Sequence, residues 1–210
     1  AEPKIIKKVY VGQPEIKLWD EYIAWTERTG SERDKIFVCH IPTEETTVVQ
    51  YFNSSGYGAS MPYFENGKLI WAGEDSTRAR CSSINYISLN ETSIGELYPG
   101  VYVHDPETNG KYYAWLDGPH GPSAKLYVWD GSETPVAAAE GVVEFGIAEN
   151  FVAYGKDEAV WIYVFENGKS YRLTPERENT QFLGVSGGYV MWMDVTSRER
   201  DIIKYALPPL

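Results

Sequence analysis

Short stretches of alternating apolar and polar residues recur along the whole chain, and no segment keeps the spacing of an amphipathic helix. The clearest repeated stretch has four residues, ends in an aromatic residue and is followed within three positions by an acid. It occupies 22–25, 68–71, 112–115, 151–154 and 189–192, and its aromatic residue, here called the anchor, is Trp25, Trp71, Trp115, Tyr154 or Trp192. The anchors are separated by 46, 44, 39 and 38 positions, a period typical of four-stranded β-propeller blades.

A second apolar stretch follows each anchor and predicts a further strand in each repeat. It covers 36–41, 84–89, 126–129, 162–165 and 202–207, and turn-forming residues such as Asp130-Gly131-Ser132 follow most copies. Shorter stretches before the anchor and after this second strand complete a set of four. The pattern predicts an all-β, five-bladed β-propeller of four antiparallel strands per blade in one domain, 1–210. The expected blades are about 12–53, 60–98, 100–140, 142–175, and 180–210 together with 4–11.

The two ends of the chain complement one another. The fifth repeat ends after its third strand, at 202–207, whereas a β-rich stretch at 5–10 precedes the first repeat and belongs to none. We expect this N-terminal strand to complete the last blade and close the ring, because closure removes an unpaired sheet edge. The same hydrogen bonds form if the strand completes the fifth blade of a neighbouring copy, and the sequence does not separate the two.

The repeat resembles the TolB-like and WD40-like family of β-propeller repeats. The matching pattern is Pro-x-Ile, Ile-Ala-Trp-x-Glu and Lys-Ile-x-Val, as in Pro14 to Ile16, Ile23 to Glu27 and Lys35 to Val38. The resemblance extends over essentially the whole chain, although Tyr154 replaces Trp in the fourth repeat. It implies the fold and a habit of binding proteins, and it implies no particular activity.

Composition and charge narrow the classes of partner. Hydrophobic residues make up 43% and charged residues 23% of the chain, as in ordinary globular proteins, and the aromatic share of 14% suits strands. The net charge of −11 argues against nucleic acid and against acidic membrane surfaces, because both would repel the chain. Apolar runs such as 159–165 are far shorter than a membrane helix, so we expect no membrane insertion.

Two features favour an extracellular or cell-surface location. The chain begins with Ala1 rather than Met, as after removal of a signal peptide. Asn53 and Asn90 begin N-x-Ser/Thr triplets, which makes them candidate glycosylation sites.

Motifs that often carry chemistry have plainer explanations here. The G-x-S-x-G match at 184–188 lies between two expected strands with no following helix, so we interpret it as a hairpin turn rather than a nucleophile elbow. His40, His104 and His120 lack metal-binding spacing, and we expect neither metal nor cofactor. Cys39 is expected to be buried, at the strand position held in the other repeats by Ile87, Trp129, Phe165 and Tyr205.

Two other functions known among five-bladed propellers remain open as alternatives. A glycosidase would use inward-facing carboxylates, for which Glu15, Asp105 and Glu144 are the candidates, so the absence of enzymatic activity is an expectation only. A lectin would place sugar pockets between successive blades, and the unequal loops here count against five equal sites.

Arginine is concentrated in the loops between the second and third strands of the repeats. These loops share one face of a propeller, together with the long loop that carries Tyr57. The face is expected either to be a solvated charged rim or to bind protein, because Arg is favoured at interfaces. Its candidate binding residues are Tyr57, Arg28, Arg33, Arg78, Arg80, Arg198 and Arg200. The leading hypothesis is a secreted, non-enzymatic module for protein interaction or assembly, for example in an extracellular filament or surface layer with copies of itself.

Overall fold

The protein is built from β-strands alone in the part of the chain that the structure describes. The computed structural model describes residues 5–6, 8, 16–27, 35–51, 62–74, 82–89, 91, 93–100, 102–119, 121, 123–132, 134–197 and 200–208. No helix in these residues is long and apolar enough to span a bilayer.

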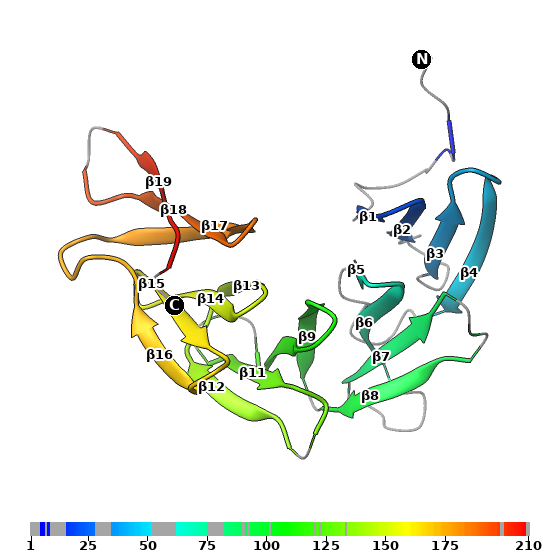
Figure 1. The fold of residues 1–210 in the computed structure, drawn as a ribbon, viewed down its shortest axis with the longest axis horizontal. Coiled ribbons are helices and arrows are strands. Elements are labelled where there is room, and N and C mark those ends of the chain that lie inside the picture. The colour runs from blue at the N-terminus through cyan, green and yellow to red at the C-terminus, as the bar shows by residue number, and fades with distance from the viewer. Residues whose placement is uncertain are drawn as a thin grey trace. The chain divides into compact units, whose positions relative to one another are not determined.

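The strands form five antiparallel sheets in chain order (Figure 1). The first sheet contains β1 (Ile16–Trp19), β2 (Tyr22–Glu27), β3 (Lys35–His40) and β4 (Glu45–Tyr51), and the second contains β5 (Tyr63–Glu65), β6 (Lys68–Glu74), β7 (Ser82–Ser88) and β8 (Gly95–Pro99). The third contains β9 (Val103–Thr108), β10 (Tyr113–Asp117), β11 (Lys125–Trp129) and β12 (Val136–Glu140). The fourth contains β13 (Glu144–Ile147), β14 (Phe151–Lys156), β15 (Ala159–Val164) and β16 (Lys169–Arg172). The fifth contains β17 (Thr180–Ser186), β18 (Tyr189–Asp194) and β19 (Ile202–Ala206).

This arrangement confirms the all-β class and the antiparallel four-stranded repeat in four of the five sheets, and five such sheets fit a propeller. The fifth sheet has three strands among the described residues. Of the N-terminal strand expected at 5–10, the described residues Ile5, Ile6 and Lys8 belong to no strand, and the others lie outside the described residues. Closure by this segment therefore stays a prediction.

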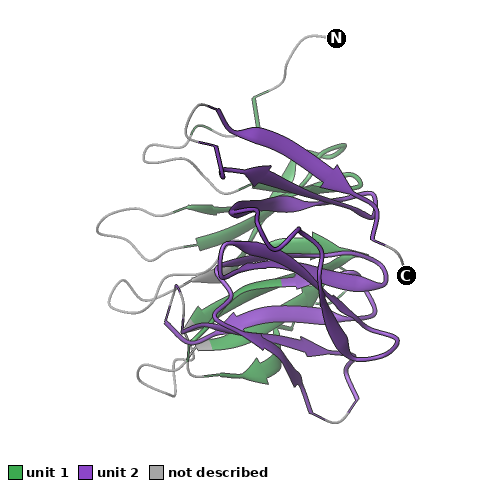
Figure 2. Ribbon diagram, turned by 90° about the vertical axis from the view of Figure 1, so that its left-hand side faces the viewer, with its two compact units in different colours: residues 1–106 green, residues 107–210 purple. Residues whose placement is uncertain are grey.

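The chain divides into two compact units, 1–106 and 107–210 (Figure 2). The first unit holds the first two sheets, and the second unit holds the fourth and fifth sheets and most of the third. Strand β9 crosses the boundary between the units. The expected blade limits and the single domain stay predictions.

The anchors are buried, as the repeat predicts. Their exposed fractions range from 0% for Trp71 and Trp115 to 6% for Trp192, with Trp25 and Tyr154 between them. Trp71 on β6 packs with Ala24 and Ile36 of the first sheet, so it lies between the two sheets of the first unit. In the first repeat the acid that follows the anchor has a direct role, because the Trp25 indole N–H donates to Glu27 Oε1 at 3.1 Å.

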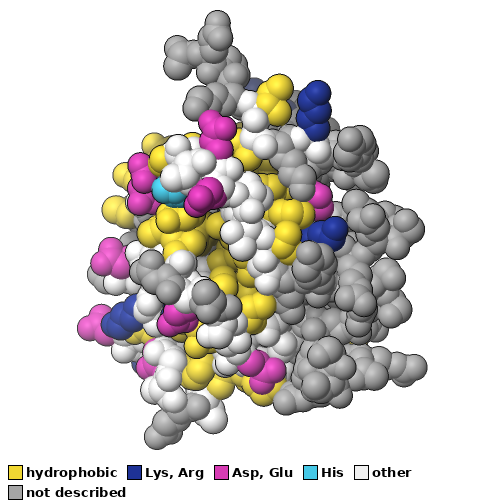
Figure 3. Space-filling model, turned by 90° about the vertical axis from the view of Figure 1, so that its right-hand side faces the viewer, with side chains coloured by type: hydrophobic (Ala, Val, Ile, Leu, Met, Phe, Trp, Pro, Cys, Tyr) yellow, Lys and Arg dark blue, Asp and Glu magenta, His cyan; other side chains and the backbone are white. Residues whose placement is uncertain are grey.

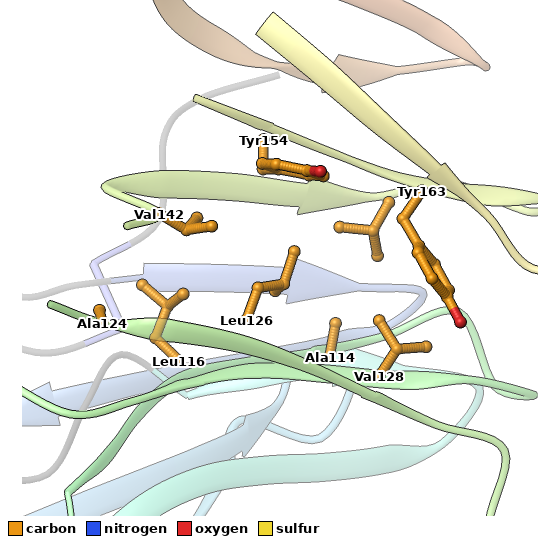
Figure 4. Close-up of a cluster of buried hydrophobic side chains, with 9 residues drawn as sticks. Ala114, Leu116, Ala124, Leu126, Val128, Val142, Tyr154 and Tyr163 are labelled. Carbon is orange, nitrogen blue, oxygen red and sulfur yellow. The ribbon is translucent and has the colours of Figure 1, made fainter. Parts of the chain in front are cut away.

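Packing between sheets follows the same rule in the second unit. Tyr154 on β14 packs against Ala114, Leu116 and Leu126 of the third sheet (Figure 4). Trp192 on β18 packs against Phe151 and other residues of the fourth sheet. In each of these pairs the anchor of the later sheet therefore faces the sheet that precedes it along the chain.

The G-x-S-x-G segment forms a hairpin turn, as predicted. Strands β17 and β18 are joined by Gly187 and Gly188, whose φ angles are +56° and +81°. Two positive φ angles in a two-residue loop fit the right-handed twist of the strands and favour glycine at both positions.

Cys39 is fully buried, as predicted, but two of its expected equivalents are wrong. Strand register relative to the anchor gives Tyr163 in the fourth sheet and Ala206 in the fifth, in place of Phe165 and Tyr205. The error in the fifth sheet is one residue, and a one-residue shift moves a side chain to the opposite face of a strand.

Candidate functional site

The last sheet presents an uncovered apolar face. Its exposed large side chains include Ile203, Tyr205, Leu207 and Tyr189, with exposed fractions of 73%, 72%, 63% and 44%. Strand register pairs Met191 with Tyr205 and Val190 with Ala206, and continuing it by one pair brings Tyr189 level with Leu207. Tyr189, Ile203, Tyr205 and Leu207 therefore share one face of the sheet. The Tyr189 and Tyr205 rings meet edge to face with centroids 5.7 Å apart.

The equivalent face of the fourth sheet is buried. Counting from the anchors, Val160, Ile162 and Val164 correspond to Ile203, Tyr205 and Leu207, and their exposed fractions are only 0%, 3% and 7%. The fifth sheet covers this face of the fourth sheet, where Phe182 and Trp192 pack on it. The comparison identifies the exposed face of the fifth sheet as one that the repeat normally covers with another sheet.

The outer edge of the fifth sheet also differs from the outer edge of the fourth sheet. The outermost strand of the fourth sheet, β16, carries the sequence Lys-Ser-Tyr-Arg, and charged side chains on an edge discourage pairing with another chain. The outermost strand of the fifth sheet, β19, carries Ile-Ile-Lys-Tyr-Ala, with one charge. An apolar edge with unpaired backbone groups favours the addition of a further strand.

The single charged side chain of β19, Lys204, is paired with two carboxylates. Lys204 Nζ donates to Asp194 Oδ2 at 2.7 Å and to Glu178 Oε1 at 2.8 Å. The hydrogen bond from Lys204, with smaller contributions from Thr196, lowers the pKa of Asp194 from its ordinary 3.8 to about 2. The same two carboxylates raise the pKa of Lys204. This cluster fixes β19 to the sheet and leaves the outer edge without a gatekeeping charge.

A groove lies between the first two sheets. We call it the first groove; its volume is about 440 Å³. Its walls include Val38 and Val49 of the first sheet and Ile87 and Leu89 of the second, and Tyr22 and His40 add two rings whose centroids are 4.8 Å apart. The groove is further lined by Thr47, Val48, Ser88, Glu45 and Glu91. Figure 3 shows a face of the molecule on which a histidine and several acidic side chains lie next to hydrophobic ones.

A second groove, of about 790 Å³, lies between the third and fourth sheets. Tyr112 and Phe165 stack in it with centroids 4.0 Å apart, and Lys111 Nζ lies 4.9 Å from the centroid of the Tyr112 ring. Asn109, Glu149, Asn150, Val164 and Glu166 complete its lining.

The two grooves occupy the same place in the repeat. Tyr22 and Tyr112 both lie three positions before an anchor. Leu89 and Phe165 both donate a backbone hydrogen bond to the turn between the first two strands of their own sheet, to Gly67 and Asn150 respectively. These grooves could not be predicted from the sequence, because each combines side chains from two repeats. The sequence feature that the two grooves share is the tyrosine three positions before the anchor, Tyr22 in one and Tyr112 in the other.

Most of the predicted arginine face lies outside the described residues. This applies to Tyr57, Arg28, Arg33, Arg78, Arg80 and Arg198, and to the candidate glycosylation sites Asn53 and Asn90. Arg200 is described and exposed. The binding role of this face stays a prediction.

The residues considered for metal binding or catalysis do not assemble a site in the described part of the chain. His104 Nδ1 and Asp105 Oδ2 form a hydrogen-bonded pair at 3.0 Å, and Glu144 is exposed at the start of β13. Glu15, His120 and Cys81 lie outside the described residues. No group of three or more His, Cys, Asp or Glu side chains that could hold a metal ion occurs among the described residues.

Sequence comparison finds no matching family model and no matching curated protein. Structure comparison finds many similar folds. One is the β-propeller domain of the Trilobed protease from Pyrococcus furiosus, described as having an open velcro topology (TM-score 0.70, 11% identity, 97% of this chain and 69% of that chain). Another is the nidogen/laminin complex (TM-score 0.57, 10% identity, 83% and 68%). A third is TolB from Acinetobacter baumannii (TM-score 0.53, 14% identity, 84% and 49%).

These similarities confirm the expected resemblance to TolB and other β-propellers at the level of the fold. The chain spans 49% of the matched TolB and 34% of a matched prolyl endopeptidase, so it corresponds to part of each. The matched structures include a prolyl endopeptidase, the β-propeller domain of a protease and a protein–protein complex. A likeness at these identities concerns the fold alone.

Proposed function

We propose that this protein is a non-enzymatic β-propeller module that assembles with copies of itself through its fifth sheet. The observation that carries the proposal is the uncovered apolar face of that sheet, with Ile203, Tyr205 and Leu207 exposed where the fourth sheet buries their equivalents. The outer edge of β19, which pairs with no further strand among the described residues, accompanies this face and would accept a strand.

The N-terminal segment 4–11 is the proposed strand. It contains Ile5, Ile6, Val9 and Tyr10, residue types that are favoured in strands. Ile5 is 77% exposed and lies in no strand among the described residues, although burying an isoleucine of this kind is favourable by about 1.5–3 kcal/mol. Pairing with β19 would bring the fifth sheet to the four strands that the other sheets have.

Whether β19 pairs with segment 4–11 of its own chain or of a neighbouring copy depends on the protein concentration. In an isolated chain, segment 4–11 competes at an effective concentration on the order of millimolar, which favours closure of its own five-bladed ring. In a crowded assembly the same segment can pair with the β19 of a neighbour, because the hydrogen bonds are identical. An extracellular filament or surface layer is one setting that supplies such concentrations, and that location stays a prediction.

Disulfide trapping between copies tests the proposal. In a background that lacks Cys39 and Cys81, one copy carries Ile6→Cys and the other carries Tyr205→Cys or Ile203→Cys. Mixing them at high concentration should give crosslinked dimers under mild oxidation. The matched acceptor control is Lys169→Cys, on the exposed outer strand of the complete fourth sheet.

Three outcomes are distinguishable. Dimers that require the β19 cysteine support strand exchange. A crosslink that forms only within a doubly substituted chain supports ring closure and contradicts assembly by exchange. Dimers that form equally well with the Lys169→Cys control, or no crosslink at all, contradict the role of β19 altogether.

A further inference from the structure

We infer that the first groove binds a lysine or arginine side chain of a partner protein. This site is separate from the fifth sheet and uses other residues. The inference depends on the composition of the groove, on the charges at its rim, and on a lysine that the chain itself places at the equivalent position of the second groove.

The walls of the first groove suit an aliphatic stem. Val38, Val49, Ile87 and Leu89 supply apolar surface from two neighbouring sheets. A lysine or arginine buries its methylene groups along such surface while its charged head stays at the rim. Ligand sites commonly combine a concave apolar lining with a few polar groups that fix orientation.

The rim of the groove suits a cation. Glu45 and Glu91 line the groove from its two sides, and both side chains are exposed. A third carboxylate lies beside the groove, because Oε2 of Glu21 is 3.6 Å from Nε2 of the lining residue His40. None of the described residues that line the first groove is a lysine or an arginine. The charge of the rim is therefore complementary to a basic side chain.

The second groove contains an internal counterpart of the proposed ligand. There Lys111 Nζ lies 4.9 Å from the centroid of the Tyr112 ring, a geometry of cation–π attraction. Glu149 and Glu166 line the same groove. The chain thus places its own ammonium group beside the tyrosine and near carboxylates.

The first groove reverses the charge at this position. Lys111 directly precedes Tyr112, and the residue that directly precedes the equivalent Tyr22 is Glu21. The first groove therefore keeps the tyrosine, replaces the internal lysine by a carboxylate, and leaves the cation to come from elsewhere. A carboxylate here also favours a basic ligand over a neutral sugar.

His40 is fixed as part of the wall. Its Nδ1 lies 2.9 Å from Thr43 Oγ1, and its ring packs against that of Tyr22. Tyr22 is in turn supported by Phe64 and Trp19 through ring contacts at 6.1 and 6.5 Å. The groove is therefore built on side chains that already pack against one another, which lowers the cost of ordering on binding.

Nuclear magnetic resonance titration of the uniformly ¹⁵N-labelled full chain tests the inference. The probes are three short capped peptides that are identical except for a central lysine, arginine or norleucine. The lysine and arginine peptides should shift the amide signals of residues 40–49 and 87–91, whereas the norleucine peptide should not. Added salt should weaken the binding, because the rim carboxylates are exposed.

Matched variants separate a specific site from general attraction to an acidic protein. Glu45→Gln and Glu91→Gln should each weaken binding about threefold, as expected for exposed charge pairs. Glu96→Gln, on the exposed side of β8, removes the same charge away from the groove and should leave binding unchanged. Because all three changes are at exposed positions, the fold of each variant can be checked from its own spectrum.

The remaining outcomes overturn the inference. Equal binding of the norleucine peptide would make the groove purely apolar, and tighter binding of free spermidine than of the peptides would point to a small polyamine. Shifts that ignore Glu45→Gln and Glu91→Gln, or the absence of shifts, would exclude a specific site. None of these results bears on disulfide trapping at β19, so the two proposals fail independently.

Discussion

At the scale of single residues, the anchor combines two properties that a repeat needs. It fills the space between two sheets, as Trp71 does against Ala24 and Ile36, and it recurs at a fixed strand position. Its aromatic area makes it a large contributor to packing, since a buried aromatic side chain removes about 150–250 Å² from water. Trp71, Tyr154 and Trp192 therefore contribute to an interface between sheets as well as to their own sheets.

Replacing an anchor tests this contribution. Trp71→Ala should lower the free energy of unfolding by about 3–5 kcal/mol, the cost of removing a large buried aromatic residue. Leu183→Ala, at a position that is 45% exposed, is the matched control and should stay within about 0.5 kcal/mol. Urea unfolding followed by circular dichroism measures both, and equal stability of Trp71→Ala and the wild type would show that the repeat is misaligned at that strand.

The carboxylate of Asp194 gives a pH-dependent prediction. Because hydrogen bonds in the folded chain lower its pKa from 3.8 to about 2, the ionised group stabilises the fold above pH 3.8. This contribution is lost as the pH falls from about 3.8 to 2. Asp194→Asn should therefore be less stable than the wild type at neutral pH, and the difference should shrink through that interval.

Chemical unfolding at a series of pH values measures the effect. Glu176→Gln provides the control, because Glu176 is an exposed neighbour in the sequence of Glu178, which shares the Lys204 cluster. A difference between Asp194→Asn and the wild type that stays constant from neutral pH to pH 2 would show that the ion cluster does not act as described.

At the scale of elements, the apolar face of the fifth sheet is either open to solvent or covered by another part of the protein or by a second copy. If segment 4–11 and another sheet cover it, Ile203 is buried in solution, and Ile203→Ala should lower the unfolding free energy by about 2 kcal/mol or more. If the face stays open, the same change should cost less than about 0.5 kcal/mol. Our proposal predicts the larger effect.

Removing the N-terminal segment provides the complementary test. A chain that begins at Gly12 should be less stable than the full chain and should lose the effect of Ile203→Ala, because no strand then pairs with β19 and holds a covering sheet on the face. It should also associate irregularly through the exposed edge. Urea unfolding of the four chains, with and without each change, measures the coupling, and additive effects would contradict pairing between the segment and β19.

The strands could be predicted from the sequence because each repeat combines an anchor, period-two alternation and turn residues, three independent signals of one structure. The same signals do not determine the exact alignment of the third strand in the fifth repeat. Placing Tyr205 rather than Ala206 at the Cys39 position shifts the strand by one residue, which assigns Tyr205 to the wrong face. Short apolar strands such as Ile-Ile-Lys-Tyr-Ala permit this slip, because apolar residues occur on both of their faces.

The grooves could not be predicted in the same way. Each groove is lined by residues of two successive repeats, which are far apart in the sequence. No linear motif spans that distance. The chemistry at their rims also depends on turn positions, where Glu21 and Lys111 differ although the neighbouring strands are alike. Repeat alignment predicts the common frame, whereas the functional differences arise at positions that the repeat does not constrain.

At the scale of the whole molecule, the net charge of −11 affects the two proposed interactions in opposite ways. Assembly of identical acidic chains works against their mutual repulsion, so added salt should promote it by screening. Binding of a basic side chain at the first groove should weaken under the same conditions. Analytical ultracentrifugation and peptide titration at low and high sodium chloride measure the two effects, and a common direction would contradict one of the assignments.

Because one aromatic anchor is buried in each sheet, the intrinsic fluorescence of the tryptophan anchors can report on the packing of individual sheets. Four of the seven tryptophans are anchors, in the first, second, third and fifth sheets, and all four are at least 94% buried. Their fluorescence should shift to longer wavelength as each interface opens to water, so single-tryptophan chains would follow the separation of individual sheets. The fourth sheet, with Tyr154 as its anchor, has no such reporter at this position, and Tyr154→Trp would supply one at the buried interface drawn in Figure 4.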